Sequence, residues 1–370
     1  MSAPDGRMNY LLMNKDTPVL LFQCSRNEFD EVEAEEQTWL SSCVPLAYWN
    51  LSVFLERRRA PKHRKHIEEL LERYQCNDTE GFLRVTHALS LNDTFWVKEE
   101  DSGLRWDEVS LYRNEFDELV SSAAFDGRFS STSLSSTSPE FGTDGYYAKC
   151  WVREDNRIYL YKTGSNTFEI EPLSEFLASQ LAQRLCPGAV SYDLDYYHDR
   201  LISKCGLFTS EAVGLVKAFD LLKGTPHTVS ELLRYFESIG SGEAFRRMCI
   251  LDALILNTDR HLGNFGVLVD NDTMDVLGMA PVFDNNRSLL FDMDMDQLTR
   301  RRDWCIRKCT PRFGTGFIQT ARGLLTDSLR AQLEQLRGFA FRQHESIKAE
   351  QERLDVLSEI VNRQIEEILR

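Results

Sequence analysis

Apolar and polar residues alternate weakly along YLLMNKDTPVLLFQCS, residues 10–25. This alternation predicts one or two β-strands. Residues 33–74 instead carry apolar side chains near helical spacing, interrupted at Pro61, and this pattern predicts helices. Trp and Tyr side chains among polar ones in residues 92–118 predict short strands or an irregular cap. We expect residues 1–120 to form an accessory module.

The pattern changes after a Ser/Thr-rich stretch that ends near Pro139. The segment GTDGYYAKCWV, residues 142–152, passes from a glycine turn into an apolar strand. The following RIYLYKTG, residues 157–164, alternates as a second strand, and together the two predict a β-hairpin. Apolar residues at helical spacing then predict a helix over residues 171–185, and residues 199–208 predict another strand.

The second half of the chain has a mainly helical pattern. Helical spacing dominates after residue 228, and a long, charged helical stretch covers about residues 326–370. The order of strands, one helix, strands and a helical half predicts an α+β fold. We expect an N-terminal module (residues 1–120), a β-rich lobe (residues 121–225) and a helical lobe (residues 226–370).

One polar loop in the helical half separates two apolar runs, within LNTDRHLGNFGVLV at residues 256–269. The run MCILDALIL before the loop predicts a buried helix, and FGVLV after it predicts a buried strand. The loop between them carries Asp259, Arg260, His261 and Asn264. Such residues add little to the stability of a loop, but they suit a site that holds a metal ion and a reacting hydroxyl.

The spacing of these residues meets the needs of phosphoryl transfer. That reaction uses a carboxylate to receive the attacking hydroxyl, and an amide with a second carboxylate to hold Mg²⁺ on the phosphates of ATP. Asp259 and Asn264 lie five positions apart in one loop, and Asp284 follows the short apolar strand APVF. Taken singly, each also fits a turn; together they favour a catalytic site.

Phosphoryl transfer also needs a cation on the phosphates that are not transferred. Lys162 lies in the second strand of the predicted hairpin and can supply this charge. A glutamate at or near the start of the next helix can pair with it, and Glu169, Glu171 and Glu175 compete for this role. The alternative interpretation is structural: the lysine would lie on the exposed face of its strand, and each glutamate would face solvent.

The strings NTDRHLGNFGVLV and APVFDNN closely resemble the catalytic loop and metal-binding segment of HipA-like serine/threonine kinases. The resemblance extends over about residues 125–320. GTDGYYAKCW and RIYLYKTG resemble the phosphate loop and lysine strand of that family, and SEFLASQLA resembles the helix that carries the paired glutamate. The resemblance implies a protein-kinase-like fold, with a β-rich lobe, a mostly helical lobe and ATP between them.

The resemblance also implies a role for each candidate residue. Asp259 would be the catalytic base, Lys162 the phosphate-binding lysine, and Glu175, rather than Glu171, its partner. Asn264 and Asp284 would be the Mg²⁺ ligands. ATP would also contact the glycine turn and the histidine of the loop, through Gly142, Thr143, Asp144, Gly145 and His261.

Composition narrows the partners of the protein. The 370 residues carry a formal net charge of −15, which argues against direct binding to nucleic acid or to an anionic membrane. The basic run RRRAPKHRKH fits a solvated helix end and turn better than a nucleic-acid patch, because a Glu-rich helix follows it. No apolar run has the length of a membrane helix, roughly 20 residues.

The cysteines bear on the compartment. Nine are scattered along the chain without a C-x-x-C pair, so a zinc site is not expected. No signal peptide is recognisable at the N-terminus. Together these features predict reduced thiols and a cytoplasmic protein.

The leading hypothesis is an ATP- and Mg²⁺-dependent serine/threonine protein kinase that acts on a protein substrate. Bacterial relatives of this type serve as toxins in toxin–antitoxin pairs, which implies a small DNA-binding antitoxin as partner. One alternative is a small-molecule or lipid kinase with the same apparatus, since the DRHxxN string also resembles phosphoinositide lipid kinases. The other is a catalytically weak, kinase-like binding module, which the intact set of candidate residues disfavours.

A hydroxyl-rich loop precedes the glycine turn, within residues 129–143. The simpler interpretation is a flexible linker. The sharper hypothesis is autophosphorylation, since a phosphate here would be repelled by the phosphates of ATP. The serine candidates are Ser130, Ser131, Ser133, Ser135, Ser136 and Ser138, and the threonines are Thr132, Thr137 and Thr143.

Overall fold

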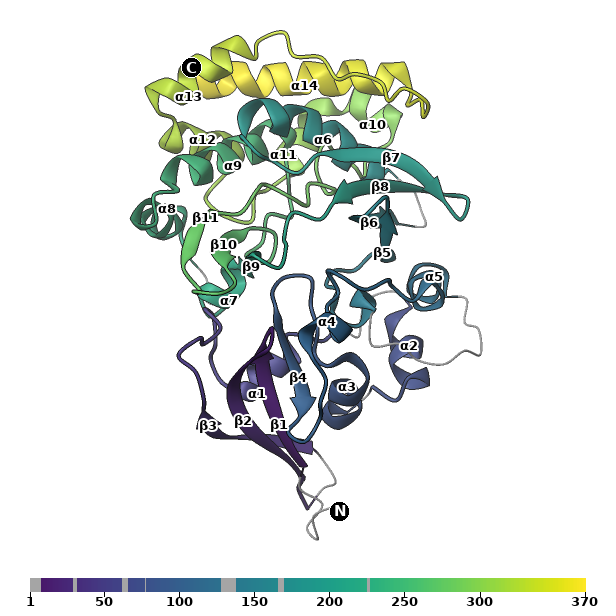
Figure 1. Ribbon diagram of the computed structural model, residues 1–370. Helices are drawn as coiled ribbons and strands as arrows, with labels where there is room; N and C mark the ends of the chain where they lie inside the picture. Colours follow the sequence, from purple (N-terminus) through teal and green to yellow (C-terminus); the bar gives the residue numbers. More distant parts are fainter. Residues whose placement is uncertain are drawn as a thin grey trace. The chain divides into compact units, whose positions relative to one another are not determined.

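The computed structural model describes residues 8–28, 32–61, 66–76, 78–127, 138–165, 170–224 and 227–370 (Figure 1). Antiparallel strands dominate the first part of the chain and helices the second, which confirms the predicted α+β class. Over these ranges, no helix is both long and apolar enough to span a membrane.

The chain forms two compact units. Unit 1 comprises Met1–Tyr161, Thr209–Val216 and Val269–Val276, and unit 2 comprises Lys162–Phe208, Lys217–Leu268 and Leu277–Arg370. Each unit therefore combines segments that are distant in the sequence. The boundaries expected after residues 120 and 225 stay a prediction.

Unit 1 begins with an antiparallel sheet of strand order β3-β2-β1-β4. Its strands are β1 (Met8–Asn14), β2 (Thr17–Arg26), β3 (Val32–Trp39) and β4 (Phe95–Glu99), so the strands predicted in residues 10–25 are confirmed. Tyr10 pairs with Phe22 across β1 and β2, and their rings stack at 5.5 Å. The apolar face of this sheet shares one core with α1 (Leu51–Glu56) and α3 (Thr79–Thr86).

The helices expected over residues 33–74 form only in part. The described helices there are α1 and α2 (Ile67–Arg73), whereas β3 is a strand at the edge of the sheet. Val32 and Ala34 pack against the core, and the β3 backbone pairs with β2. This pairing joins residues distant in sequence, so tertiary contacts override a local helical pattern.

The rest of unit 1 leads to the predicted hairpin. It contains α4 (Trp106–Val109), α5 (Glu118–Asp126) and a 3-10 turn, η1 (Pro139–Gly142). The strands β5 (Lys149–Glu154) and β6 (Arg157–Thr163) are neighbours in a sheet of order β5-β6-β8-β7, which confirms the hairpin.

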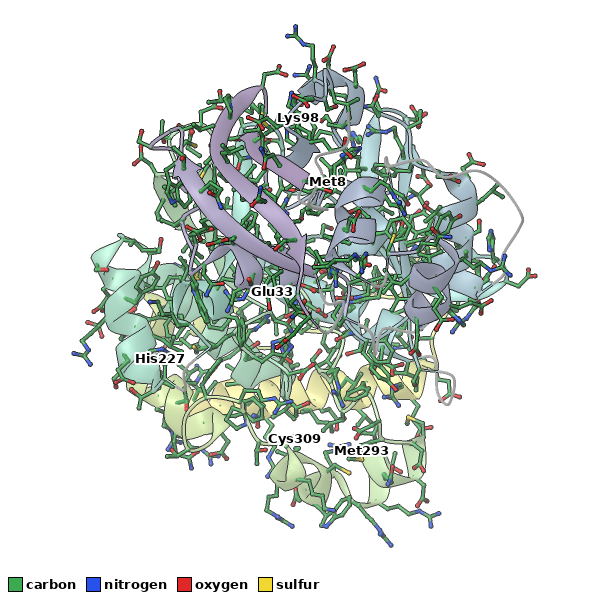
Figure 2. All side chains as sticks on the ribbon, turned by 90° about the horizontal axis from the view of Figure 1, so that it is seen from below. Met8, Glu33, Lys98, His227, Met293 and Cys309 are labelled. Carbon is green, nitrogen blue, oxygen red and sulfur yellow. The ribbon has the colours of Figure 1, made fainter. Side chains whose placement is uncertain are left out.

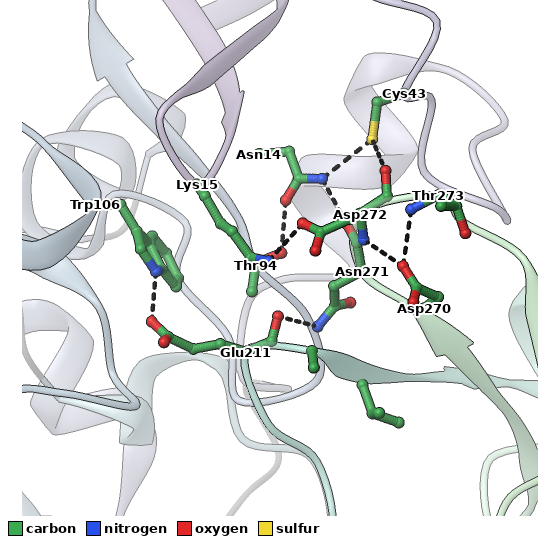
Figure 3. Close-up of polar contacts among 12 residues, drawn as sticks. Asn14, Lys15, Cys43, Thr94, Trp106, Glu211, Asp270, Asn271, Asp272 and Thr273 are labelled. Atoms are coloured by element: carbon green, nitrogen blue, oxygen red, sulfur yellow. Dashed lines mark hydrogen bonds and ion pairs between the residues drawn. The ribbon is translucent and has the colours of Figure 1, made fainter.

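A distant turn completes unit 1 (Figure 3). Asn271 is fully buried, and its side-chain amide donates to the carbonyl oxygen of Ser210 at 3.0 Å. Its own carbonyl oxygen accepts a 2.7 Å hydrogen bond from Asn14, whose side chain also accepts one from Thr94 at 2.6 Å. These buried bonds hold the turn between β10 (Gly266–Asp270) and β11 (Val276–Met279) against the N-terminal sheet.

Unit 2 is mostly helical. Its first part contains α6 (Glu171–Leu185), which has the bounds predicted from the sequence, and the antiparallel pair β7 (Tyr192–Tyr197) and β8 (Arg200–Gly206). β9 (Val213–Lys217), which lies in unit 1 up to Val216, is the edge strand of a sheet of order β11-β10-β9. The remaining helices are α7 (Ala218–Leu221), α8 (Val229–Ser238), α9 (Gly242–Ile255), α10 (Met295–Arg300), α11 (Arg302–Lys308), α12 (Phe317–Leu324), α13 (Asp327–Gln335) and α14 (Gln351–Leu369).

The helix α9 is the centre of unit 2. It packs against α6, α8, α12 and α14, and every residue of its last two turns is buried. A helical segment with apolar residues on almost every side, such as these two turns, is stable in such a buried position. The buried helix predicted from MCILDALIL is thus confirmed, as is the strand β10 predicted from FGVLV.

Two local predictions in unit 2 are wrong. The segment APVF belongs to no strand, because the pairing with β10 is made by the preceding β11. Residues 326–370 are not one helix: α13 and α14 are separate and lie side by side (Figure 1). Gly338, at a positive φ of 75°, follows α13 and turns the chain back.

Candidate active site

A buried ion pair joins β6 to α6 in unit 2. The ammonium of Lys162 lies 2.9 Å from Oε1 of Glu175, and both side chains are buried. The second oxygen of Glu175 accepts a 2.7 Å hydrogen bond from Ser203 on β8. Burial raises the pKa of Glu175, while the Lys162 ammonium lowers it. Each oxygen of the carboxylate thus has a partner, as a buried charge requires.

The same lysine contacts a second carboxylate. Its ammonium lies 2.8 Å from Oδ1 of Asp284, whose side chain is 29% exposed. Burial lowers the pKa of Lys162, but Asp284 and Glu175 raise it further, so that the net pKa lies above the ordinary value. The backbone of Asp284 adopts a left-handed φ of 54°, and its N–H donates to the Tyr192 hydroxyl at 3.1 Å. Such strain is common at functional sites.

The loop after α9 begins with another left-handed residue. Leu256, at φ 53°, ends the helix and turns the chain into the loop. The side-chain oxygen of Asn257 then accepts a hydrogen bond from the N–H of Asp259 at 3.0 Å. The side-chain amide of Asn264 donates to the carbonyl oxygen of Asp259 at 2.9 Å. The two candidate residues five positions apart are therefore held together by a direct bond.

Arg260 connects this loop to the segment of Asp284. Its buried guanidinium pairs with Asp252 on α9 at 3.0 Å and donates to the carbonyl oxygens of Asn264 at 2.9 Å and Phe283 at 2.6 Å. It also donates to the side-chain oxygen of Asn285. Through these two carbonyl oxygens, the Arg260 side chain holds the backbone of Asn264 and of Phe283, the residue before Asp284.

The carboxylate of Asp259 is 19% exposed and faces two cations. Arg312 approaches its Oδ1 at 3.2 Å, and Arg287 approaches its Oδ2 at 3.9 Å. His261 also lies in the loop, but its side chain is exposed, and its Nδ1 accepts a 3.0 Å hydrogen bond from the N–H of Gly263.

The glycine turn, residues 142–145, belongs to unit 1. Gly142 ends η1, and Gly145 has a positive φ of 105° that favours glycine. The carbonyl oxygen of Asp144 accepts a 2.7 Å hydrogen bond from the Lys149 ammonium. The hydroxyl of Thr143 donates to the Pro139 carbonyl and accepts from the indole of Trp151. Phosphate contacts for this turn stay a prediction.

Most of the proposed autophosphorylation sites lie outside the described residues, namely Ser130, Ser131, Ser133, Ser135 and Ser136, with Thr132 and Thr137. Ser138 is described, and its side chain is buried within unit 1. A kinase would reach this hydroxyl only after a local opening of the chain.

The oxygen donors of the site suit a hard cation. Asp284 offers a carboxylate and Asn264 an amide oxygen, the ligand types that Mg²⁺ prefers. Throughout the described ranges, no cluster of three or more His, Cys, Asp or Glu side chains could hold a metal ion. Mg²⁺ does not need one, because water and the phosphates of a nucleotide complete its coordination. The residues present therefore fit an Mg²⁺ ion that binds together with the nucleotide.

Comparison with known proteins places the fold. No family model matches the chain, and no curated protein matches its sequence. The structure of Shewanella oneidensis HipA, solved with HipB and operator DNA, matches 97% of this chain and 99% of its own, with a TM-score of 0.53 and 11% identity. The chain has the kinase-like fold of HipA. The likeness to this type of kinase, inferred from sequence motifs, is thus confirmed at the level of the fold.

The kinase CtkA of Helicobacter pylori is a second structural neighbour. It matches 60% of this chain and 88% of its own, with a TM-score of 0.46 and 15% identity.

Sequence reasoning missed the residues that support the site. Arg260 was noted only as one polar residue of the loop, although it joins the loop to α9 and to the Asp284 segment. A signal for it existed: Asp252 is the one charge in the apolar run MCILDALIL, and a buried charge needs a partner. Ser203 and Tyr192 gave no such signal, because a hydroxyl in a strand is common.

Proposed function

We propose that the chain is an ATP- and Mg²⁺-dependent serine/threonine protein kinase of the HipA-like type. The observation that carries the proposal is the Lys162 ammonium between two carboxylates, at 2.9 Å from Glu175 and 2.8 Å from Asp284. Phosphoryl transfer from ATP needs a cation for the phosphates, held by an acidic partner, and a carboxylate nearby for the metal.

In this proposal Glu175 and Ser203 hold the ammonium of Lys162 toward the phosphates of ATP. Asp284 and the amide oxygen of Asn264 would hold Mg²⁺, which neutralises the phosphate charge during transfer. The glycine turn of residues 142–145 and His261 would make further contacts with ATP. Lys162 can exchange Asp284 for a phosphate without losing its bond to Glu175.

Asp259 would receive the proton of the acceptor hydroxyl at one carboxylate oxygen. Its backbone is fixed by Asn257 and Asn264, so the carboxylate starts from a defined position. A general base gains rate from such positioning, since the hydroxyl must lie within hydrogen-bond reach.

The test is the Asp259→Asn substitution. Purified protein with labelled ATP, Mg²⁺ and a cell lysate should transfer phosphate to protein serine or threonine, and Asp259→Asn should lower the rate by about 10²-fold or more. Calorimetry should find ATP binding largely retained, because the base acts mainly in the transition state. Undiminished transfer by Asp259→Asn would remove this residue from the mechanism.

The lysate assay also separates the kinds of kinase. Label in protein supports the proposal, whereas label in small molecules or lipids alone would favour the alternative acceptors. Absence of label in every fraction, with ATP bound, would favour a binding module. The expected cytoplasmic location, inferred from the scattered cysteines, belongs to the same proposal.

The partner of HipA in its complex suggests a partner for this chain. We include in the proposal a toxin role, held in check by a small DNA-binding antitoxin. The net charge of −15 fits a protein that reaches DNA only through such a partner. Induced synthesis in bacterial cells should then arrest growth, and the Asp259→Asn variant should not. Equal growth of both cultures would count against a toxin.

A further inference from the structure

Two arginines occupy the position beside the proposed base. Arg312 lies 3.2 Å from Oδ1 of Asp259, and Arg287 lies 3.9 Å from Oδ2. Their side chains are 56% and 43% exposed, whereas Asp259 is only 19% exposed. The site of the acceptor hydroxyl is thus bordered by two guanidinium groups that solvent, and therefore a substrate, can reach.

The backbone next to each arginine is held in place. The carbonyl oxygen of Arg287 accepts hydrogen bonds from the N–H and the hydroxyl of Thr258, both at 3.2 Å. Phe313, the residue after Arg312, packs edge-on against the buried ring of Phe265, with centroids 5.7 Å apart. The two exposed guanidinium groups are therefore attached to backbone that is held in place near Asp259.

The contact between Arg312 and Asp259 occupies one oxygen of the proposed base. A general base must hydrogen-bond to the hydroxyl from which it takes a proton. Arg312 uses one of the two carboxylate oxygens, and an exposed ion pair of this kind exchanges readily because it is weak. A guanidinium that leaves Asp259 is best stabilised by another carboxylate at the same place, because the guanidinium can donate two parallel hydrogen bonds to the two carboxylate oxygens.

We propose that Arg312 and Arg287 bind acidic side chains beside the acceptor hydroxyl, so that the preferred substrate is an acidic protein segment. This inference rests on the proposed kinase function and names its substrate class. The carboxylates of the substrate form ion pairs with the two guanidinium groups in place of Asp259. The carboxylate of Asp259 then accepts a hydrogen bond from the acceptor hydroxyl. Arg312 and Arg287 act as specificity residues, not as catalytic residues.

The charge of the chain segment that carries both arginines agrees with this substrate class. Residues 287–312 contain seven arginines and lysines against four aspartates, a net charge of +3 in a chain of net charge −15. Much of this charge lies between Met293 and Cys309, both labelled in Figure 2, on the helices α10 and α11. The exposed members there are Arg300, Arg301, Arg307 and Lys308. A basic region on an acidic protein favours an acidic partner.

The test compares two peptides with the full-length protein. One has a single serine flanked on both sides by glutamates, and the other has glutamines at the same positions. The wild type should phosphorylate the glutamate peptide with a kcat/KM about fivefold higher or more, since each exposed ion pair adds a modest factor. In Arg312→Gln and Arg287→Gln the ratio should fall toward one, and in Arg312→Glu it should fall below one.

The matched control is Arg337→Gln, because Arg337 is 50% exposed, pairs with Glu366 and lies outside residues 287–312. This variant should keep the wild-type ratio. Binding of each labelled peptide, followed by fluorescence anisotropy, tests the inference without any transfer. Equal binding of both peptides by the wild type, or an unchanged preference in Arg312→Gln, would overturn it. Peptide preference without phosphate transfer would instead count against the kinase proposal alone.

Discussion

At the scale of single residues, two buried ion pairs organise the site, Lys162 with Glu175 and Arg260 with Asp252. In both pairs the acidic residue lies on a helix, and the basic residue comes from a strand or loop elsewhere in the chain. Buried pairs of this kind add little net stability over apolar residues, but the loss of one partner leaves a charge in the interior. Their value is therefore geometric, and stability and activity should respond differently to substitution.

For the first pair we expect Lys162→Met to destabilise the protein by about 3 kcal/mol, because it leaves the fully buried Glu175 without its cation. Adding Glu175→Gln should recover a large part of this loss, while phosphate transfer stays absent. Urea denaturation measures the stability. Arg337→Gln, which breaks a half-exposed pair with Glu366, is the control and should change stability by less than about 1 kcal/mol. No loss in Lys162→Met would mean that Glu175 is neutral.

For the second pair the same logic separates folding from positioning. Arg260→Met should cost about 3–5 kcal/mol, since it leaves the carboxylate of Asp252 unpaired. The double variant Arg260→Met with Asp252→Leu should regain much of this stability in urea unfolding. It should nevertheless remain inactive, because the bonds to the carbonyl oxygens of Asn264 and Phe283 are gone. Recovery of activity together with stability would contradict a positioning role for Arg260.

At the scale of elements, short connections decide what the helices and strands present. The loop after α9 owes its course to Leu256 at its start and to Arg260 in its middle. The turn after β10 is held in unit 1 by Asn271, and the strand β9 runs close beside it (Figure 3). In each case, a buried polar side chain replaces the backbone pairing that a loop lacks.

The close approach at β9 gives a direct prediction. A Cβ atom at Gly214 would lie 2.4 Å from the side-chain oxygen of Asn271 and 2.8 Å from the backbone oxygen of Asn92. Gly214→Ala should therefore destabilise the protein by about 1–3 kcal/mol, because a backbone atom would have to move. Gly103→Ala is the matched control, since its Cβ would meet nothing within 4 Å. Thermal unfolding of both variants and the wild type measures this difference. Equal melting temperatures of Gly214→Ala and Gly103→Ala would refute the predicted clash.

At the scale of the whole molecule, the two compact cores keep most thiols away from water. Seven of the nine cysteines are buried, and Cys43 and Cys309 are half-buried. Burial raises the pKa of Cys24, Cys76, Cys186, Cys205 and Cys309 to about 12. The pKa of a thiol in the unfolded chain is about 8.5.

The sign of the resulting pH dependence follows. Below the unfolded pKa, the thiols are protonated in both states and their contribution is complete. As the pH rises toward about 12, the unfolded chain loses protons first, and stability falls. The urea midpoint should thus decrease between pH 8 and pH 10.5, and the decrease should be smaller in Cys186→Ala. A midpoint that rises over this range would contradict the burial of the thiols.

The sequence by itself determined the elements whose pattern is local. The helix α6, the hairpin strands β5 and β6, and the buried run of α9 follow from periodicity alone, because their burial is continuous along the chain. The candidates Lys162, Glu175, Asp259, Asn264 and Asp284 were also chosen from the sequence, since phosphoryl transfer demands these residue types in an ordered series. Their roles remain proposals that the experiments above test.

Only the tertiary structure decided which of these residues meet. The edge strand β3 was missed because its hydrogen bonds come from β2. The break between α13 and α14 was missed because the two helices pack against each other, which joins residues distant in the sequence. Glu175, rather than Glu171, contacts Lys162 because helix packing selects one face of α6. The arginines Arg260, Arg287 and Arg312 acquire their meaning in the same way, since ion pairs between distant residues leave no periodic trace in a sequence.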